Sequence, residues 1–279
     1  MKLIALGDNC VDVYRNKGEV HPGGNAVNVA VHAARCGAES EYIGNLADDE
    51  YAEHLVKALE KNRVRYDRCP VIKDSKTKQC VYEVTDGERS FIEVVTGDAW
   101  AGPVTVSEDL MQVLSQADVI VSSCNAKIPE QLPAVEELPP VFVFDFGEKE
   151  KYRTPEYCDT VCRKIDLAMF SCSRMTDDEF AEFVRPFHEH GIIHVLATMG
   201  SAGQIISNGS MILRKQIQQV VPHDTMGAGD SFLAGFVCEL QKSGWRKGKR
   251  MPSETLENAL LAGQNISRMN VLSPGGFGD

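Results

Sequence analysis

The sequence predicts an α/β protein built on a mostly parallel central sheet, with helices on both faces and a small inserted β lid. After residue 97, short continuous apolar runs alternate with helical patterns, as expected for parallel strands that are buried on both faces. Between residues 69 and 97 the apolar period changes to two, which indicates an antiparallel hairpin inserted among the βα units. The chain has 279 residues, 43% of them hydrophobic, and no clear linker, so we expect a single domain over 1–279.

The composition restricts the partners and the location of the protein. With 40 acidic against 29 basic residues the net charge is −11, so we expect neither nucleic acid nor a membrane surface as a partner. No stretch has the apolar length of a transmembrane helix, and residues 1–6 indicate a strand rather than a signal peptide. The nine cysteines are odd in number and scattered through apolar segments, which favours reduced thiols and a cytoplasmic location. Cys158 and Cys162 lie four residues apart without further ligands nearby, so we interpret them as helix packing rather than a metal pair.

The first strand, expected at 2–6, is followed by a polar segment. Open α/β sheets bind ligands just beyond the carboxyl ends of their parallel strands, so Asp8, Asn9 and Asp12 are candidates for holding the hydroxyls of a polyol. Turn formation is the alternative explanation, and it suits Asp8 better than Asp12.

A helix is expected to begin at Asn25 and to stop at Gly37. The turn of Gly24 precedes it, and Asn25 suits the N-cap position. Asn25 and Asn28 lie three residues apart and share a face of the first turn, where their amides can donate and accept toward sugar hydroxyls. Capping alone would explain Asn25 but leaves Asn28 without a role.

The inserted hairpin is expected to turn at Asp86-Gly87. A short strand near 11–14 could pair with it. Polar and aromatic side chains on one face favour a lid, formed by about 12–21 and 69–97, over a plain edge hairpin.

The remaining elements follow from apolar periodicity and turn signals. Strands are expected at 41–44, 117–122, 141–146, 166–170 and 192–197, and an Asn208-Gly209 turn joins 204–207 to 211–215. Helices are expected at 49–61, 130–137, 155–163, 177–190 and 254–269, before a glycine-rich tail loop at 271–278.

The segment 224–232 indicates a turn of small residues between a short strand, 218–221, and a helix. Gly227 and Gly229 permit conformations and close approaches that side chains forbid. The first N–H groups of a helix have no partner within it and favour an anion. Asp230 is therefore either an N-terminal cap or a base beside a bound phosphate, and the segment alone does not distinguish the two.

Three motifs follow one another along the chain: Gly-Gly-Asn-x-x-Asn at 23–28, Thr-x-Gly-x-x-Gly at 198–203 and Asp-Thr-x-Gly-Ala-Gly-Asp-Ser-Phe at 224–232. In this order and at these separations they resemble the ribokinase-like (PfkB) carbohydrate and nucleoside kinases, over nearly the whole chain. The opening Gly-Asp-Asn-Cys-Val-Asp-Val-Tyr at 7–14 and the Gly-Gly-Phe-Gly tail look closest to the fructoselysine 6-kinases, which phosphorylate a fructosyl-amine on its 6-hydroxyl. No P-loop and no Gly-x-Ser-x-Gly motif competes with this resemblance.

The resemblance implies a role for each matching position. The base would be Asp230, and the anion hole for the transferring phosphate would be formed by Gly227, Ala228 and Gly229. The sugar-binding positions would be Asp8, Asp12, Gly24, Asn25 and Asn28. The nucleotide-side loop would include Thr198, Gly200 and Gly203. The family also implies ATP with Mg²⁺ as the phosphate donor, and a monovalent cation such as K⁺ beside Asp224.

One departure from the family concerns the metal. Many members carry Asn-x-x-Glu after the strand that is expected to end at Phe170, whereas this chain has Ser-Cys-Ser-Arg at 171–174. The family motif therefore does not identify the Mg²⁺ ligands in this chain, and Asp177, Asp178 and Glu179 are the candidates.

We therefore expect an ATP-dependent kinase for the primary 6-hydroxyl of a fructosyl-amine such as fructoselysine. Acidic residues in the first loop and the lid favour such a cationic sugar-amine. A ribokinase- or fructokinase-like enzyme and a nucleoside kinase are the alternatives within the family. A non-catalytic sugar or nucleotide sensor is the alternative outside it, and the complete turn at 227–229 with Asp230 argues against a sensor. A homodimer through the lid is also expected, because an exposed strand edge needs cover.

Overall fold

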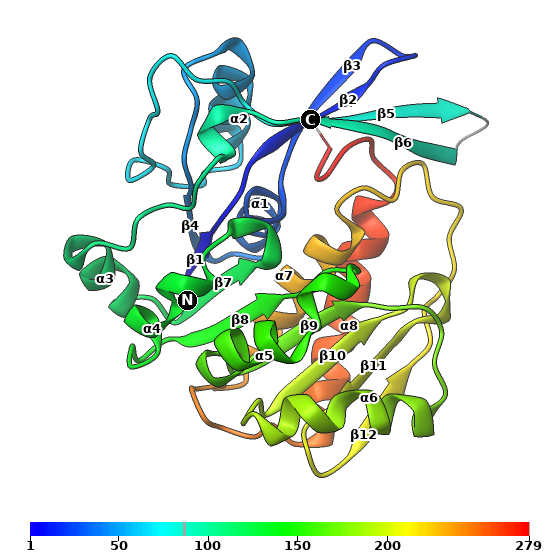
Figure 1. Ribbon diagram of the computed structural model, residues 1–279. Helices are drawn as coiled ribbons and strands as arrows, with labels where there is room; N and C mark the ends of the chain where they lie inside the picture. The colour runs from blue at the N-terminus through cyan, green and yellow to red at the C-terminus, as the bar shows by residue number, and fades with distance from the viewer. Residues whose placement is uncertain (86–87, 279) are drawn as a thin grey trace.

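The computed structural model describes residues 1–85 and 88–278 and contains two β-sheets (Figure 1). The larger sheet has eight strands, in the spatial order β12 (Ile212–Lys215), β11 (Gln204–Ser207), β10 (His194–Thr198), β9 (Leu167–Ser171), β8 (Val141–Asp145), β7 (Val119–Ser123), β1 (Lys2–Leu6) and β4 (Glu39–Ile43). Neighbouring strands from β4 to β10 run parallel, whereas β11 and β12 are antiparallel to their neighbours. The mostly parallel central sheet expected from the sequence is confirmed.

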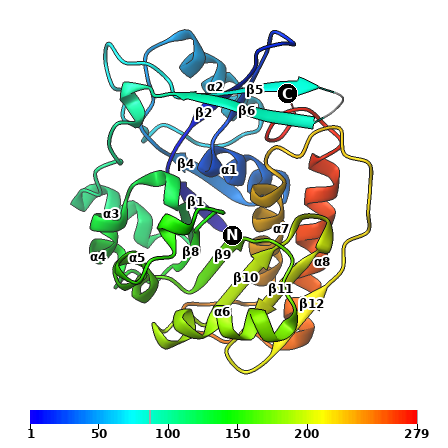
Figure 2. The same ribbon diagram turned by 45° about the vertical axis from the view of Figure 1, so that its right-hand side comes forward.

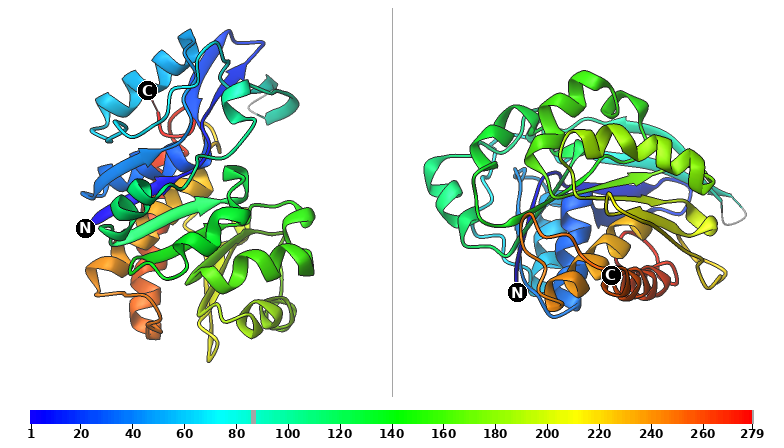
Figure 3. Two further views of the ribbon diagram at one scale, coloured as in Figure 1. Left: turned by 60° about the vertical axis from the view of Figure 1, so that its left-hand side comes forward. Right: turned by 90° about the horizontal axis from the view of Figure 1, so that it is seen from below.

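Helices cover both faces of the larger sheet (Figure 3). One face carries α1 (Asn25–Arg35), α7 (Ala228–Lys242) and α8 (Ser253–Asn270), and the other carries α3 (Glu108–Ser115), α4 (Leu132–Val135), α5 (Pro155–Val161) and α6 (Asp177–Glu189). Successive residues of β1 enter different cores: Leu3 packs on the side of Phe232, and Ile4 packs on the side of Phe180. This double burial explains why the parallel strands are continuous apolar runs.

The smaller sheet is the lid, ordered β3 (Glu19–Gly23), β2 (Cys10–Tyr14), β5 (Gln79–Thr85) and β6 (Glu88–Val95) (Figure 2). The strand expected near 11–14 does pair with the hairpin, because β2 runs parallel to β5. The lid strand begins at Gln79 rather than at residue 69, because Val71 pairs with Leu46 beside α2 (Glu50–Lys61) instead. The turn expected at Asp86-Gly87 lies outside the described residues.

Residues 216–222 form no strand, so the strand expected at 218–221 is wrong. Side chains from α8 hold this segment in place of a ladder. Gln264 Nε2 donates to the carbonyl of Gln216 at 3.1 Å, and Arg268 Nη1 donates to the side chain of Gln218 at 2.5 Å. The apolar end of the run does not enter a core, since Val221 is 89% exposed.

Two helices differ from the expectation. The sequence pattern did not predict α3, although Ser107 caps it by accepting a hydrogen bond from the Leu110 N–H at 3.2 Å. A helix of eight residues is too short to show a sustained apolar period. The helix expected at 130–137 is reduced to α4, which follows a 3₁₀ turn at Pro129–Gln131.

All nine cysteines are free thiols, including the neighbouring pair Cys158 and Cys162, both of which are buried. Within the residues that the structure describes, no helix combines the length and the apolarity that crossing a membrane requires.

Candidate active site

Asn25 and Asn28 of α1 bind the carboxylate of Asp230 at the start of α7. Asn25 Nδ2 donates to Oδ1 at 2.6 Å, and Asn28 Nδ2 donates to Oδ2 at 2.7 Å. The expectation that Asn25 caps α1 is wrong, because Gly24 is the N-cap and Asn25 is the first helical residue. Asp230 is not a cap either, since Gly227 holds that position in α7. The side chains of Asn25, Asn28 and Asp230 therefore do not cap their helices, and they form one cluster between the starts of α1 and α7.

The pKa of Asp230 is raised to about 7. Burial is the largest cause, and the charges of Asp145 and Asp8 add to it, while the hydrogen bonds from the two asparagines oppose it. Asp145, the last residue of β8, accepts a hydrogen bond from Asn25 Nδ2 at 2.9 Å and one from the Gly147 N–H at 2.8 Å. Burial raises the pKa of Asp145 to about 6. A carboxylate with a pKa near neutrality is well suited to accept a proton at physiological pH.

Asp8 lies buried just beyond the end of β1 and forms an ion pair with Lys78, with 2.8 Å between Oδ2 and Nζ. Burial alone would lower the pKa of Lys78, but the charge of Asp8 raises it well above its ordinary value, so the ammonium stays charged. Asp8 Oδ1, Asn25 Oδ1 and Asn28 Oδ1 are buried and have no hydrogen-bond partner among the described residues. Buried acceptors without donors are costly, so a ligand that brings hydroxyl or ammonium donors would stabilise this site.

Two glycines bring the polar segments together. A Cβ on Gly23 would lie 2.6 Å from Asp12 Oδ2 and 3.9 Å from Asn28 Oδ1, so both of these oxygens lie beside Gly23. Gly24, at φ 107°, lies against the backbone after β1, where a Cβ would be 2.6 Å from the Cα of Asn9. Gly24 therefore acts through its backbone, by letting the start of α1 approach the end of β1.

The turn before α7 presents N–H groups at a helix N-terminus. Gly227 adopts φ 67° and lies against the tail loop, where a Cβ would be 2.3 Å from the carbonyl oxygen of Gly276. The Ala228 N–H makes only a long hydrogen bond, 3.3 Å, to the carbonyl of Thr225. The helix dipole and the N–H groups of Gly227, Ala228 and Gly229 together favour an anion at this turn.

A cavity of about 970 Å³ opens beside this turn, a volume typical of small-molecule sites. It is bordered by the start of α7, the loop after β10 and one face of α8, and its lining includes Ala228, Gly229, Thr198, Gly200, Leu261 and Gln264. Gly203, expected in the same loop, does not line the cavity. Its N–H donates to the carbonyl of Gly200 at 3.1 Å and closes the turn.

Asp224, the position expected beside a monovalent cation, accepts hydrogen bonds from the turn, the tail loop and the lid. Oδ1 accepts from the Met226 N–H at 2.9 Å. Oδ2 accepts from the Gly275 N–H at 2.9 Å and from the hydroxyl of Tyr14, a residue of the lid strand β2. One carboxylate therefore connects the lid, the tail loop and the anion-binding turn.

The sequence matches the pfkB family of carbohydrate kinases over residues 1–277. The chain belongs to this family. This PfkB kinase is 35% identical to the fructosamine kinase FrlD of Bacillus subtilis over 238 residues. The match covers 85% of this chain and 82% of that relative. This kinase is 30% identical over 267 residues to the fructoselysine 6-kinase of Escherichia coli, and this match covers 95% of the chain and 98% of that relative.

The same fold occurs in the structure of Arabidopsis thaliana ribokinase complexed with ribose and ATP. The two structures superimpose with a TM-score of 0.80 at 22% identity, covering 100% of this chain and 96% of that chain. The ribokinase-like fold expected from the sequence is therefore confirmed, and this PfkB kinase is a phosphotransferase that acts on an alcohol group of a sugar.

Sequence reasoning missed three side chains of the site of this PfkB kinase: Asp145, Lys78 and Tyr14. Asp145 could have been found, because it ends a buried strand in the same way as the residues after β1. Lys78 and Tyr14 carry no local signal, since their partners lie 70 and 210 residues away in the sequence.

Acidic side chains near the cavity differ from those considered for the metal. Asp177 pairs with Arg214 at 2.8 Å, and Glu179 closes a capping box with Thr176. Neither lines the cavity, whereas Glu148 and Glu150 do.

Proposed function

We propose that this PfkB kinase transfers the γ-phosphoryl group of ATP to the 6-hydroxyl of a fructosyl-amine such as fructoselysine, with Asp230 as the base. The position of Asp230 is the observation that supports its role as the base. Its carboxylate is held by Asn25 and Asn28 within the first turn of α7, beside N–H groups that favour a phosphate.

In this reaction the O6–P bond forms while the bond between the γ-phosphorus and the β,γ-bridging oxygen of ATP breaks. Asp230 takes the proton of the 6-hydroxyl, and ADP leaves. The N–H groups of Gly227, Ala228 and Gly229 stabilise the negative charge on the transferring phosphoryl oxygens. The two asparagines hold the carboxylate in one orientation, so the distance between base and hydroxyl is set before ATP reacts.

The charges of the side chains around the proposed sugar-binding region support a cationic acceptor. Asp8, Asp12, Asp145 and Asp230 contribute four carboxylates to this region, and Lys78 is the ammonium that pairs with one of them. A fructosyl-amine carries an ammonium group beside its sugar hydroxyls, so it offers both charge and donors to the buried acceptors. The similarity to a fructosamine kinase and a fructoselysine 6-kinase supports the same substrate class.

The large cavity suits ATP. Its lining runs from the anion-binding turn through Thr198 and Gly200 to Leu261 on α8, so the phosphates of ATP would lie at the turn and the adenine beside α8. Glu148 and Glu150 fit a Mg²⁺ ion held mainly through water and phosphate oxygens, because Mg²⁺ needs few direct protein ligands. Bound there, Mg²⁺ would neutralise charge on the phosphates.

The lid supports a homodimer as a further part of the proposal. β6 lies at the end of the lid sheet and has no second neighbour in the part of the chain that the structure describes. Its side chains include the exposed apolar residues Phe91, Ile92, Val94 and Val95. An apolar edge strand has unpaired backbone groups that can bond to a strand of another chain, and a second copy would bury both this edge and these side chains.

A substrate panel tests the proposed acceptor. ADP release is measured with Mg²⁺-ATP and fructoselysine, other fructosyl-amino acids, fructose, ribose and nucleosides. We expect kcat/KM for fructosyl-amines to exceed that for fructose by at least about tenfold, which corresponds to the loss of one well-made polar contact. The ³¹P signal of the product should couple to the methylene protons of C6. Equal values of kcat/KM for fructose and fructoselysine would contradict the substrate, and sugar binding without turnover would favour a sensor.

A further inference from the structure

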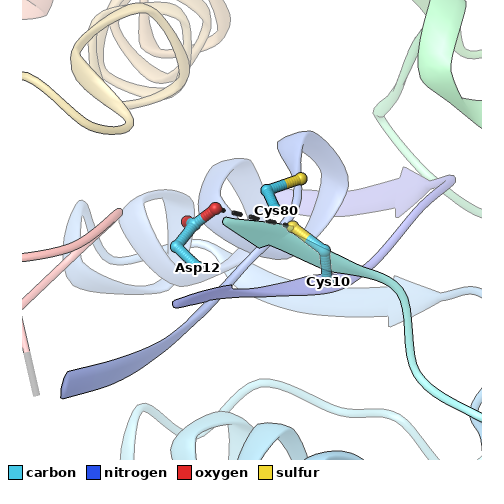
Figure 4. A group of neighbouring side chains, drawn as sticks. All are labelled: Cys10, Asp12 and Cys80. Carbon is cyan, nitrogen blue, oxygen red and sulfur yellow. Dashed lines mark hydrogen bonds between the residues drawn. The ribbon is translucent and has the colours of Figure 1, made fainter. Parts of the chain in front are cut away.

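Two thiols and a carboxylate converge on one face of the lid sheet (Figure 4). Cys10 and Asp12 are alternate residues of β2, and Cys80 of β5 pairs with Asp12 in the parallel register. Their ligand atoms all lie within 4.8 Å of one another, and Cys10 Sγ is 3.9 Å from Asp12 Oδ1. Cys10 and Asp12 are buried, whereas Cys80 is half-buried and leaves an approach from solvent.

This donor set suits a thiophilic metal ion. Zn²⁺ binds thiolate at about 2.3 Å and carboxylate oxygen at about 2.1 Å, so tetrahedral coordination places neighbouring ligand atoms roughly 3.5 to 3.8 Å apart. The 3.9 Å between Cys10 Sγ and Asp12 Oδ1 approaches that range, and the other separations lie within 4.8 Å. Three protein ligands leave one position for water, as in many zinc sites with an open coordination position.

The other thiol pairs of the chain provide a contrast. Cys36 interacts with Cys238, and Cys158 interacts with Cys162. Among the described residues, however, only the set of Cys10, Asp12 and Cys80 brings three Cys, His, Asp or Glu ligand atoms so close together. A pair of neighbouring thiols is thus common in this protein, and the added carboxylate distinguishes the lid cluster.

We propose that Cys10, Asp12 and Cys80 form a binding site for a thiophilic divalent metal ion such as Zn²⁺, and that a metal in this site excludes the sugar. The second part rests on the proposed function, in which Asp12 contributes one of the carboxylates around the sugar. Asp12 joins the two sites, because Oδ1 faces Cys10 and Oδ2 lies beside Gly23, just before the start of α1. A metal ion that binds the carboxylate withdraws it from the sugar and places positive charge where a cationic acceptor would bind.

Direct metal binding is measured with cadmium chloride, whose thiolate complexes absorb in the ultraviolet, on protein kept reduced by a phosphine. The wild-type chain should bind one Cd²⁺ with a sulfur-to-metal charge-transfer band, and Zn²⁺ should displace it. Cys10→Ser and Cys80→Ser should each weaken binding by at least about tenfold, since even outer-shell changes cost that much. Cys36→Ser is the matched control and should bind like the wild type. If circular dichroism shows that a serine variant is unfolded, Cys80→Ala, at the half-buried position, replaces it in the titration.

The exclusion of sugar is measured by kinetics with Zn²⁺ at fixed Mg²⁺-ATP. Zn²⁺ should raise KM for the fructosyl-amine without lowering kcat in the wild type and in Cys36→Ser, and Cys80→Ser should respond at least about tenfold less. The site is wrong if the wild type shows no charge-transfer band, or if both serine variants bind Cd²⁺ as tightly as the wild type. A band with no effect of Zn²⁺ on KM would overturn the exclusion alone. If no sugar is phosphorylated, the proposed function fails, but the Cd²⁺ titration still decides the metal site.

Discussion

The hydroxyl of Tyr14 donates a hydrogen bond to the carboxylate of Asp224 and so links the lid to the turn before α7. Asp224 also accepts from the N–H groups of Met226 and Gly275, which fixes the turn and the tail loop to the same group. The position of the lid and the shape of the anion-binding turn are therefore coupled through one buried carboxylate.

Replacing Tyr14 by Phe tests this coupling. The variant loses a hydrogen bond to a charged group, which contributes about 1.5 to 3 kcal/mol, so kcat/KM for the sugar should fall by about tenfold or more. The melting temperature should fall as well, because the lid loses its tie to the turn. Steady-state kinetics and thermal unfolding measure the two effects.

The matched control for Tyr14→Phe is Tyr66→Phe. The hydroxyl of Tyr66 donates to Glu60 at 2.6 Å, so this variant also loses a tyrosine–carboxylate bond, but one that lies outside the site. Its kcat/KM should equal that of the wild type. An equal loss of kcat/KM in both variants would show that the link between lid and turn has no special role.

Asp230→Asn should lower kcat by about 10²- to 10⁴-fold, the usual contribution of a general base, with little change in KM for the sugar. An amide keeps the shape of the carboxylate but cannot accept the proton of the hydroxyl. Asp109→Asn, at an exposed position in the first turn of α3, is the control and should keep wild-type turnover. Full turnover in Asp230→Asn would remove Asp230 from the role of base.

The pH dependence follows from the raised pKa of Asp230. The base works when ionised, so log kcat/KM should fall as the pH drops below about 7. Folding raises this pKa from 3.8, so the native state holds the proton more tightly than the unfolded state, and ionised Asp230 destabilises the fold increasingly from about pH 4 to about pH 7.

Asp230→Asn removes this penalty and should melt higher than the wild type at pH 8, by roughly 2 to 4 °C for each kcal/mol gained. The difference should shrink at pH 4, where Asp230 is protonated in the native state. A variant that melts below the wild type at pH 8 would contradict the destabilising charge.

The monovalent cation beside Asp224 stays a prediction of the family resemblance. Initial rates are compared in K⁺ and in tetramethylammonium at equal ionic strength, and a higher rate in K⁺ is expected. Asp224→Asn should lose the difference between the two salts, because the neutral amide attracts a cation less strongly. Equal rates of the wild-type chain in both salts would mean that hydrogen bonds from protein groups are sufficient to order Asp224.

The sequence predicted the parts of the fold that depend on local periodicity. Buried parallel strands such as β8 are continuous apolar runs, so their positions were clear. Short elements were not: α3 is too short for a sustained period, and residues 218–221 have an apolar end but are held by side chains of α8. Tertiary contacts decided the structure in those places.

The candidate site shows the same division. The motifs that match the family place Asp230, Asn25 and Asn28 in the expected site, but the local pattern also permits Asn25 as a cap, since a short polar side chain suits a cap and a ligand site equally. The pairs Lys78–Asp8 and Tyr14–Asp224 depend on how the lid packs on the main body. Such long-range pairs have no signature in one sequence.

The proposed homodimer makes a prediction about the lid edge. Ile92→Lys should shift the protein from a dimer toward the monomer of 30.7 kDa in light scattering at micromolar concentration. Ile92 is 40% exposed on the edge strand β6, and a lysine there places charge in the apolar contact that a second copy would form.

Val221→Lys is the control, because Val221 is also apolar and exposed but lies outside β6, in the segment held by side chains of α8. It should leave the dimer intact. The same loss of mass in both variants would indicate a general effect of added charge on association. A wild-type monomer at micromolar concentration would contradict the homodimer.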